Sequence, residues 1–259
     1  MKLKGKIAIV TGGGMGIGRA ISVKFAEAGA LVIIGDIEEE YANETINLIE
    51  TATGEKRGVF VRADISSPED CALLINFAKS NYDKLDILVN NAGVSDMTSV
   101  CELKIERWHE IMNVNLDAHF ILCKKAIPLM QKNQWGRIVN ISSAMGLMAH
   151  KMAAAYSVSK AGVVQLTRQM ALDYGEDNIT VNAICPGIID TQMTGFILED
   201  EEMNEYFKSV TPLRRIGLPE DVANLALFLS TEEAGFITGT AIPVDGGAIA
   251  GTDVLLGPR

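Results

Sequence analysis

The chain has 259 residues, of which 48% are apolar and 22% charged, and its formal net charge at pH 7 is -10. These fractions support a large buried core and exclude a chain that is disordered throughout. No run of lysine or arginine exceeds two residues. An acidic chain of this kind would repel a phosphate backbone, so we expect no nucleic-acid partner.

The sequence also points away from a membrane and from a metal. No stretch approaches the roughly 18 consecutive apolar residues that a membrane-spanning helix needs, and we see no apolar leader segment after Met1. Four scattered cysteines, Cys71, Cys101, Cys123 and Cys185, predict free thiols in a reducing cytoplasm rather than a disulfide framework. The three histidines show no ligand spacing, so we expect no metal site.

Short β-branched runs alternate along the chain with longer segments of helical period. Continuous apolar runs suit strands buried on both faces of a parallel sheet. Repeated strand and helix units predict one domain over residues 1–259, with an α/β Rossmann-like doubly wound fold and a seven-stranded parallel sheet flanked by helices on both faces. The predicted strands are Ile7 to Val10, Leu31 to Ile34, Val59 to Val61, Ile87 to Val89, Ile138 to Ile141, Val181 to Ile184 and Ala241 to Val244. The predicted helices are Gly18 to Ala28, Glu38 to Thr51, Pro68 to Tyr82, Ile105 to Asn113, Leu116 to Gln131, Ala154 to Tyr174 and Pro219 to Leu229.

One segment, Ile188 to Leu213, interrupts this alternation and carries the acidic run Glu199 to Glu202. A long insertion beyond the carboxyl end of a strand can act as a lid over a site. A solvated surface loop with a small helix is the alternative, and the sequence leaves both open.

The first predicted strand leads into a glycine-rich turn, Thr11 to Gly18, with the sequence TGGGMGIG. Its glycines allow a tight turn and let backbone N–H groups approach a pyrophosphate, to which the following helix offers its positive end. The spacing differs from the usual G-x-G-x-x-G, and a plain strand-to-helix turn is the alternative.

Asp36 ends the second run, eighteen residues after Gly18. A carboxylate there can accept hydrogen bonds from both ribose hydroxyls of an adenosine, and it would repel a 2′-phosphate. Ile37 follows, so no adjacent cation is present to bind that phosphate. This pattern predicts NAD rather than NADP as the cofactor, the alternative being an exposed acid that caps the next helix.

Two further polar groups end predicted strands. Asp64 follows the third run and could bond an adenine amino group, or it could form a turn that caps the next helix. Asn90 to Gly93, with the sequence NNAG, ends the fourth run. Asparagine side chains there can brace neighbouring strands while Gly93 lets a cofactor pass closely, and an ordinary turn is the alternative.

Tyr156 and Lys160 are four residues apart in a predicted helix, so they share one face of it. A free phenol has a pKa of about 10, and a nearby ammonium should lower that pKa by favouring the phenolate. Ser143 could hold a carbonyl or alcohol oxygen against the phenol. The three residues predict a proton-transfer site, whereas Tyr156 alone would be more simply explained as a packed core residue.

Together these motifs resemble the classical short-chain dehydrogenase/reductase family. The match spans nearly the whole chain and ends with TGTAIPVDGG at Thr238 to Gly247. The matching pieces, in chain order, are TGGGMGIG, NNAG, Asn115 within NVNL, Ser143 within NISS, YSVSK from Tyr156 to Lys160, and PGIIDT from Pro186 to Thr191.

The resemblance implies a role for each matching residue. Tyr156 would be the acid in reduction and the base in oxidation, and Ser143, rather than Ser142, would orient the substrate oxygen. Lys160 would hold the nicotinamide ribose and lower the tyrosine pKa, and Asn115 would hold a relay water. Ile188 and Thr191 would bracket the nicotinamide. The expected NAD contacts are Gly12, Met15, Gly16, Ile17, Gly18, Asp36, Asp64, Ile65, Asn91, Ala92, Gly93, Tyr156, Lys160, Pro186, Gly187, Ile189 and Thr191.

The loops after the fifth and sixth strands are expected to line the substrate pocket. Methionines there adapt to irregular shapes and favour an apolar secondary alcohol or ketone, although gap-filling in a core is their alternative role. A steroid, a sugar or polyol, a cyclic diol and a small diketone all remain open. The expected lining residues are Met145, His150, Met193 and Phe196, with Leu147, Met148, Met152 and Ile189, and with Asp96 and Met97 from the loop after NNAG.

The leading hypothesis is an NAD(H)-dependent oxidoreductase. A 3-oxoacyl thioester reductase of fatty-acid synthesis is the nearest rival, and that activity generally uses NADPH. A non-catalytic NAD-sensing regulator and a methyltransferase are rivals of other classes, and neither needs Tyr-x-x-x-Lys. The predicted helices Leu116 to Gln131 and Ala154 to Tyr174 look apolar over wide faces, and the resemblance then implies a homotetramer.

Overall fold

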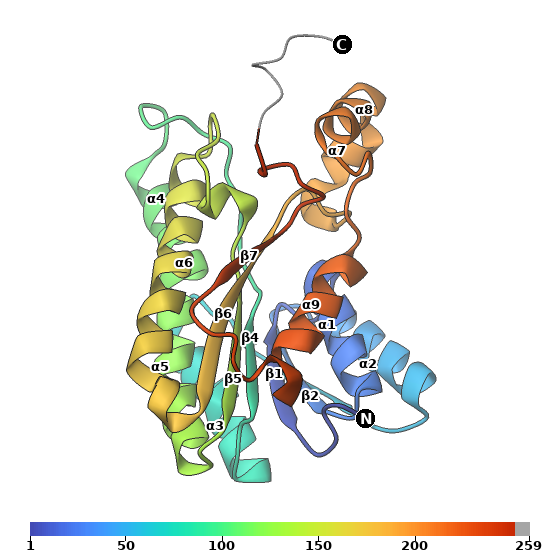
Figure 1. Cartoon of the computed structure of the whole chain (residues 1–259), viewed down its shortest axis with the longest axis vertical. Helices are drawn as coiled ribbons and strands as arrows, with labels where there is room; N and C mark the ends of the chain where they lie inside the picture. The colour runs from blue at the N-terminus through green and yellow to red at the C-terminus, as the bar shows by residue number, and fades with distance from the viewer. Residues whose placement is uncertain (252–259) are drawn as a thin grey trace.

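A computed structural model describes residues 1–251 of the chain. Within them, seven strands form one parallel sheet in the order β3-β2-β1-β4-β5-β6-β7 (Figure 1). The predicted seven-stranded parallel sheet is confirmed. The strands are β1 (Ile7–Thr11), β2 (Leu31–Asp36), β3 (Gly58–Arg62), β4 (Ile87–Asn90), β5 (Gly136–Ile141), β6 (Ile179–Pro186) and β7 (Ala241–Val244).

Helices cover both faces of this sheet (Figure 1). On one face α1 packs against α2 and α9, and on the other α3 packs against α5 while α4 packs against α6. The helices are α1 (Gly16–Glu27), α2 (Glu39–Thr53), α3 (Pro68–Tyr82), α4 (Ile105–Met112), α5 (Ala118–Lys132), α6 (Ala154–Tyr174), α7 (Gly195–Glu199), α8 (Glu201–Val210) and α9 (Pro219–Leu229).

One predicted helix begins later than expected. The helix expected at Leu116 begins as an α-helix only at Ala118, because Asn113–Asp117 forms a π-helical turn in which the Ala118 N–H bonds the Asn113 carbonyl. Such turns are rare and often lie at functional sites. Helices α3, α6 and α9 have the bounds that the sequence predicts.

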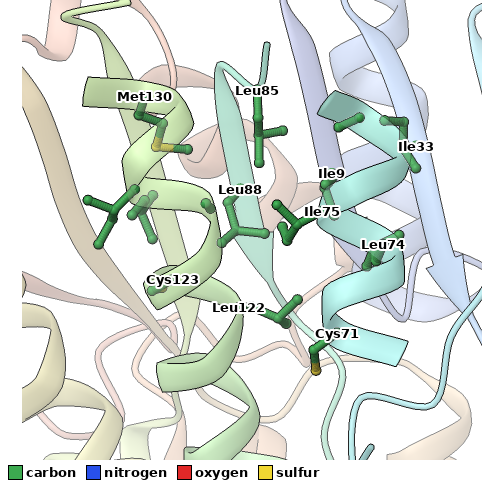
Figure 2. Packing of buried hydrophobic residues seen from close by; sticks show 14 of the residues in the cluster. Ile9, Ile33, Cys71, Leu74, Ile75, Leu85, Leu88, Leu122, Cys123 and Met130 are labelled. Carbon is green, nitrogen blue, oxygen red and sulfur yellow. The ribbon is translucent and has the colours of Figure 1, made fainter. Parts of the chain in front are cut away.

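Each central strand feeds two hydrophobic cores, because successive side chains point to opposite faces of the sheet. Ile9 and Leu88, which are register partners on β1 and β4, are fully buried on the face covered by α3 and α5 (Figure 2). Val10 and Val89 are fully buried on the opposite face, with α1 and α9. Burying each such side chain contributes about 1.5–3 kcal/mol relative to exposure.

The parallel arrangement brings the carboxyl ends of all the strands to one edge of the sheet. Strand order reverses between β1 and β4, because β2 and β3 extend the sheet from β1 on one side and β5 to β7 extend it from β4 on the other. In open α/β sheets, ligands bind outside the carboxyl ends of the strands at such a switch point. The chain therefore presents a candidate site between the turns that follow β1 and β4.

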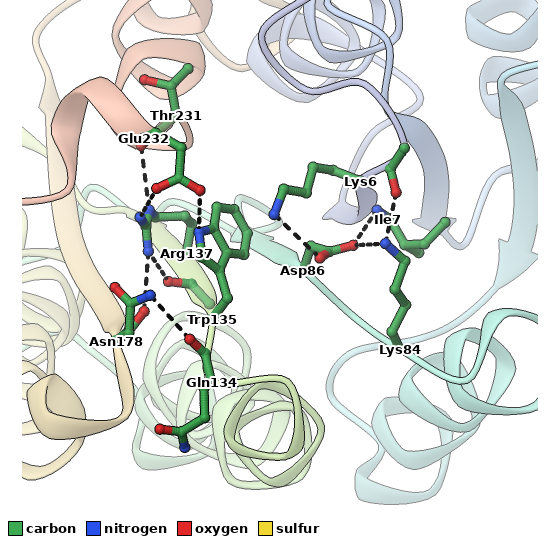
Figure 3. Close-up of polar contacts among 12 residues, drawn as sticks. Lys6, Ile7, Lys84, Asp86, Gln134, Trp135, Arg137, Asn178, Thr231 and Glu232 are labelled. Atoms are coloured by element: carbon green, nitrogen blue, oxygen red, sulfur yellow. Dashed lines mark hydrogen bonds and ion pairs between the residues drawn. The ribbon is translucent and has the colours of Figure 1, made fainter.

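The opposite, amino edge of the sheet is held by a buried carboxylate, Asp86 (Figure 3). Asp86 accepts a hydrogen bond from the Ile7 N–H at 2.8 Å and pairs with Lys84 at 2.9 Å and Lys6 at 3.6 Å. Removing one partner of a buried charged pair leaves the other without compensation, which makes such pairs costly to break. This contact ties the segment before β1 to the segment before β4.

A buried guanidinium, Arg137 at the start of β5, extends the network at the amino edge (Figure 3). Arg137 donates to the Gly136 and Asn178 carbonyls at 2.8 and 3.2 Å and pairs with Glu232 at 3.4 Å. The Trp135 ring lies 3.1 Å from the Lys6 ammonium and 4.3 Å from Arg137 Cζ, measured to the ring centroid. Cation–π attraction and charge-assisted hydrogen bonds thus join β1, β5 and the turn after α9.

The segment 188–213 contains more helix than the sequence predicts. It forms a 3-10 turn (Gln192–Thr194) followed by α7 and α8, which contact each other. Helix α8 buries none of its side chains in this chain. An isolated bridge between Ile189 and Gly217 closes the base of the segment.

The remaining composition-based expectations concern cysteines, membranes and metals. All four cysteines are free, and Cys101 alone among them is exposed. In residues 1–251, no helix combines the length and the apolar character needed to cross a membrane. The same residues hold no group of three or more His, Cys, Asp and Glu side chains that could bind a metal ion.

The apolar character of α6 is explained largely within this chain. Val163, Val164, Met170 and Ala171 are buried, and Met170 and Ala171 belong to the core on the face covered by α3 and α5. An assembly through α6 would use its exposed apolar side chains instead, such as Val158 and Leu172.

Candidate active site

The glycine-rich turn after β1 approaches two other loops closely. Gly12 and Gly16 have φ angles of +62° and +51°, which glycine adopts without strain. A Cβ atom on Gly12 would lie 3.1 Å from Ala92 Cα, and one on Gly16 would lie 3.1 Å from Thr191 Cγ2. The turn therefore lies against NNAG on one side and PGIIDT on the other.

Gly14, at the centre of this turn, is held through both of its backbone polar groups. Its N–H donates to Asp36 Oδ2 at 2.9 Å. Its carbonyl accepts from Arg19 Nε at 2.8 Å and from Thr45 Oγ1 at 3.0 Å. Sequence reasoning missed both residues. Arg19 lies five residues after Gly14 on α1, and Thr45 lies 31 residues after it on α2. Helical position alone does not show that either side chain reaches the Gly14 carbonyl.

The first turn of α1 is suited to an anion. Met15 caps the helix without a side-chain hydrogen bond, and no acid lies in the first turn. The free N–H groups and the positive end of the helix are the elements that bind a pyrophosphate. The turn and the helix thus fit the phosphates of a dinucleotide, with Gly12, Met15, Gly16, Ile17 and Gly18 as the contacting backbone.

Asp36 is buried, so the alternative of an exposed capping acid is wrong in part. Besides holding Gly14, its Oδ1 accepts a 3.2 Å hydrogen bond from the N–H of Glu38, just before α2. Each carboxylate oxygen can accept more than one hydrogen bond. Asp36 can therefore hold the turn and still accept ribose hydroxyls.

Asp64 follows β3 and forms a local turn. Its Oδ1 accepts from the N–H and the hydroxyl of Ser66 at 2.9 and 2.7 Å. This geometry matches the turn-forming alternative for Asp64. The side chain of Ile65, its neighbour, is buried in the core, so only the backbone of Ile65 is placed to contact a cofactor.

The NNAG turn braces neighbouring strands, as the sequence predicts. Asn91 Nδ2 donates to the Thr11 carbonyl at 2.9 Å, and the Thr11 hydroxyl accepts from the Asn91 N–H at 2.9 Å. Asn90 Nδ2 donates to Asn140 Oδ1 at 2.8 Å. A Cβ atom on Gly93 would lie 3.1 Å from Asn115 Oδ1 and 3.4 Å from Lys160 Nζ.

Ser143 and Tyr156 form the reactive pair of the candidate site. Ser143 follows β5 and is largely buried, and its hydroxyl accepts from the Met145 N–H at 3.1 Å. A hydrogen bond with Ser143 lowers the pKa of the Tyr156 phenol. Ser142 points elsewhere, because its hydroxyl donates to the Lys160 carbonyl at 2.8 Å. The preference for Ser143 over Ser142 agrees with this geometry.

The buried amine of Lys160 lies on the same face of α6 as Tyr156. Its Nζ donates to the Ile141 carbonyl at 3.0 Å and is 5.8 Å from the centroid of the Tyr156 ring. Burial lowers the pKa of Lys160 from 10.5 to about 8, with a smaller opposing effect of Cys185. At neutral pH the amine is charged but easily deprotonated.

The expected direction of the tyrosine pKa shift is not found. Burial raises the pKa of Tyr156, and the Ser143 hydrogen bond opposes that shift only in part. Lys160 is not among the causes, because its ammonium binds a carbonyl of β5 rather than the phenol. Desolvation thus outweighs the amine at this phenol.

Asn115 lies in the π-helical turn and is fully buried. Its Oδ1 accepts from the Val94 N–H at 2.8 Å, and its Nδ2 donates to the Val94 carbonyl at 2.9 Å. The side chain is thus occupied in fixing the loop after NNAG. Nδ2 also donates to Ser159 Oγ at 3.2 Å, so a water held by Asn115 would donate to the second lone pair of Oδ1 or to the backbone carbonyl.

The loop after β6 supplies the third wall. Gly187 N–H donates to the Val244 carbonyl at 3.0 Å, which continues the pairing of β6 beyond Pro186. Thr191 lies against Gly16 of the glycine-rich turn. The Ile189 side chain is buried in the core, so the expectation that it lines the substrate pocket is wrong.

Most predicted substrate residues are at the surface. Met193 and Phe196 are exposed, and His150 is exposed with Nδ1 at 2.8 Å from the Lys151 carbonyl. Met145 is half-buried beside Ser143. These positions agree with a pocket rim.

Sequence reasoning also missed a buried imidazole. His119 lies one helical turn after Asn115 and is almost fully buried, and neither ring nitrogen makes a well-formed hydrogen bond. The pKa of His119 is lowered to about 3, mainly by burial and to a smaller extent by the charge of Lys160, while the Asn90 carbonyl opposes both effects. His119 is therefore neutral at any working pH.

These residues can bind an oxygen and move one proton. A hydroxyl, a phenol and an amine meet beside NNAG, which contacts the glycine-rich turn at the switch point of a parallel sheet. Fold and site together define an oxidoreductase of the dinucleotide-binding type.

Comparison with known proteins agrees with this assignment to the oxidoreductases. A family model described as Enoyl-(Acyl carrier protein) reductase matches residues 12–248. The chain is 40% identical over 256 residues to an uncharacterized oxidoreductase of Thermotoga maritima, covering 96% of this chain and 100% of the relative. It is 39% identical to the 3-oxoacyl-(acyl-carrier-protein) reductase FabG of Aquifex aeolicus, covering 95% of this chain and 98% of the relative.

Among solved structures, a putative short-chain alcohol dehydrogenase from Sinorhizobium meliloti superposes with a TM-score of 0.92 at 37% identity, covering 97% of this chain and 99% of that one. The chain belongs to the classical short-chain dehydrogenase/reductase family. Members of this family typically use a nicotinamide cofactor.

We expect the substitution Lys160→Met to stabilise the chain in the absence of cofactor at neutral pH. The charged amine is buried in the folded chain and hydrated in the unfolded one, and the fall in its pKa from 10.5 to about 8 corresponds to about 3 kcal/mol. Below about pH 8 the amine is charged in the folded and the unfolded parent, so the full destabilisation of about 3 kcal/mol applies to the parent. Between about pH 8 and 10.5 only the unfolded parent keeps the proton, so the advantage of the variant shrinks as pH rises.

Urea unfolding of parent and variant at a series of pH values checks this expectation. The difference between the two proteins is the quantity to compare, because Cys71 and Cys123, whose pKa values are raised to about 11 and 12, titrate in both. A variant less stable than the parent at pH 7 would contradict it.

Proposed function

We propose that this protein is an NAD(H)-dependent oxidoreductase that interconverts a secondary alcohol and a ketone, with Tyr156 as the acid or base. The observation that carries the proposal is the convergence of Ser143, Tyr156 and Lys160 beside NNAG, which itself contacts the glycine-rich turn. A non-catalytic sensor of NAD would have no use for this trio.

Each residue has a task in the proposed reaction. A nicotinamide ring, when bound, supplies or accepts the hydride. Ser143 holds the substrate oxygen by a hydrogen bond, and Tyr156 gives that oxygen a proton in reduction or removes it in oxidation. Lys160 lies where it can bind the nicotinamide ribose and supply positive charge to the phenolate.

The resting protonation states suit proton donation. Because burial raises the pKa of Tyr156, the phenol is protonated at neutral pH. Oxidation needs the phenolate, and stabilising it requires positive charge close to the oxygen. The ammonium of Lys160, 5.8 Å from the centroid of the Tyr156 ring, provides this charge, and Asn115 passes the proton on through a bound water.

The preference for NAD over NADP is supported by the surroundings of Asp36. The carboxylate lies at the end of β2 within hydrogen-bond distance of the glycine-rich turn, and Ile37 follows it. A 2′-phosphate on the adenosine ribose would meet this negative charge, and the nearby guanidinium of Arg19 is already engaged by the Gly14 carbonyl and by Glu44. Like charges placed together against the wrong ligand are a common basis of such discrimination.

We expect parent protein to bind NADH at least about tenfold more tightly than NADPH, and Asp36→Asn to narrow that ratio. Asparagine keeps an oxygen for the Gly14 N–H while removing the charge that repels the phosphate. Glu38→Gln, which removes a neighbouring exposed charge, is the matched control and should leave the ratio unchanged. Fluorescence titration with both cofactors measures the ratio, and tighter binding of NADPH by the parent would overturn the preference.

Replacing Tyr156 by phenylalanine should lower kcat by roughly a hundred- to ten-thousand-fold, the usual contribution of a positioned acid or base. Tyr174→Phe, at the far end of the same helix, is the control and should keep the parent kcat. The absorbance change of NADH with a panel of ketones and alcohols gives the rates. A Tyr156→Phe variant with unaltered turnover would show that the phenol is not catalytic.

A second candidate is a 3-oxoacyl thioester reductase, favoured by the similarity to FabG of Aquifex aeolicus. That activity also reduces a ketone, so the same trio could perform it. The cofactor titration separates the two, because the rival generally uses NADPH. A parent protein that prefers NADPH and reduces a 3-oxoacyl thioester faster than simple ketones would favour the rival.

We further propose that the chain forms a homotetramer and that the protein resides in the cytoplasm. Segment 188–213 acts as a lid over the site. Exposed apolar side chains on α5, α6 and the loop before β7 support an assembly: Phe120, Val158, Leu172 and Phe236. The four free thiols agree with a reducing compartment. Light scattering should give four times the chain mass of 27.9 kDa, and a monomer would contradict the assembly.

A further inference from the structure

Met152 has a backbone conformation that its side chain disfavours. Its φ angle is +61°, in the left-handed region where a Cβ atom is crowded by the backbone. Met152 lies two residues before the start of α6 and four before Tyr156. Strain of this kind persists where surrounding structure enforces it, and it clusters at functional sites.

The other non-glycine residues with positive φ in the described chain have simpler explanations. Asp83 and Asn178 are the caps that end helical segments, Gln134 follows the end of α5, and Arg214 follows a turn closed by its own N–H. Met152 precedes a helix instead of ending one, and it alone among the five has an apolar side chain. It lies in a turn, where an apolar side chain is an unusual choice for this conformation.

Met152 belongs to a group of exposed apolar side chains at the edge of the sheet that carries the reactive trio. They are carried by the loops that follow β4, β5 and β6, which are adjacent strands. The loops after β4 and β5 touch, since the Ala154 N–H donates to the Thr98 carbonyl at 3.4 Å. The six side chains, each between 37% and 59% exposed, are Met97, Leu147, Met148, Met152, Met193 and Phe196, and we call them the apolar rim.

Methionine is concentrated in these loops. Five of the eleven methionines of the chain lie within residues 91–104, 142–153 and 187–200. Methionine is flexible and polarisable, so it can follow the shape of different apolar ligands. Single exposed apolar residues need no explanation, but a set in adjacent loops at the same edge of the sheet as the reactive trio indicates a binding surface.

We propose that the substrate carries an extended apolar arm, which leaves the reacting carbon and lies against the apolar rim. This inference rests on the proposed oxidoreductase function and names the substrate class for it. A small diol or polyol would not cover the rim. A ketone or alcohol with a long alkyl or fused-ring substituent would bury it when bound.

A homologous series of methyl ketones with NADH tests the proposal directly. From 2-butanone through 2-hexanone and 2-octanone to 2-decanone, we expect kcat/KM to rise about two- to fourfold per added methylene, since full burial of one methylene is worth about fourfold. Acetoin and a linear polyol serve as small polar comparison substrates.

Two variants test whether the rim is the cause. Met152→Gly removes the side chain and its backbone strain, so we expect the ratio of kcat/KM for 2-decanone to that for 2-butanone to fall at least about fivefold without a lower melting temperature. Met193→Ala removes a side chain of the apolar rim from the loop after β6 and should lower the same ratio. Gln134→Gly is the matched control, because it relieves the same backbone conformation at the amino edge of the sheet. Its ratio should equal that of the parent.

The possible outcomes separate this proposal from the function on which it rests. A flat series in the parent, or a preference for acetoin or the polyol, would overturn the apolar arm while leaving the oxidoreductase activity in place. An unchanged ratio in both rim variants would also overturn it. If neither ketones nor alcohols of any length were turned over with NADH or NADPH, the proposed function itself would fail and the arm with it.

Discussion

The removal of the Lys160 amine from water is the constraint on which the site depends. A charged group in that position lowers the stability of the fold, and among residues 1–251 the Ile141 carbonyl is the group that accepts a hydrogen bond from it. The amine can stay there because α6 is anchored on β6 and because Asn115 fixes the loop that closes over it. The Lys160 Nζ atom is thus both a reactive group of the candidate site and a source of instability in the folded chain.

The surroundings of this amine are built in layers. Val94 is held by both polar groups of the Asn115 side chain, and Ser142 holds the backbone of Lys160 itself. The π-helical turn places Asn115 out of the register that a regular helix would give it. A neutral, buried His119 adds no charge that would compete with the amine. Rigid supports of this kind keep reactive groups within the small tolerances that catalysis needs.

Much of the architecture could be predicted from the sequence, because the apolar runs of a parallel sheet are continuous and its helices begin at recognisable residues. Pro68 and Pro219 start α3 and α9 where the pattern places them. The π-helical turn could not be predicted, since it changes the hydrogen bonding of residues whose helical periodicity looks ordinary. The two helices in segment 188–213 were underestimated because α8 buries nothing in this chain.

The site was predictable in its membership but not in its electrostatics. Spacing alone places Tyr156 and Lys160 on one face, yet the direction of the tyrosine pKa shift depends on where the amine points and how deeply the phenol is buried. The contribution of Arg19 to the glycine-rich turn depends on a side chain folding back over one helical turn. Ile189 looked like a pocket residue because it follows PGI, but its side chain turns into the core.

The network of Asp86, Arg137 and Trp135 has a consequence for how such a protein can change over time. These contacts join the beginnings of strands, whereas the reactive groups and the apolar rim follow their ends. Insertions and substitutions in the loops at the carboxyl ends of the strands therefore leave the contacts at the amino ends unchanged. The two ends of the strands thus serve different purposes. New substrate loops could be grafted onto the carboxyl ends while the contacts at the amino ends keep the scaffold assembled.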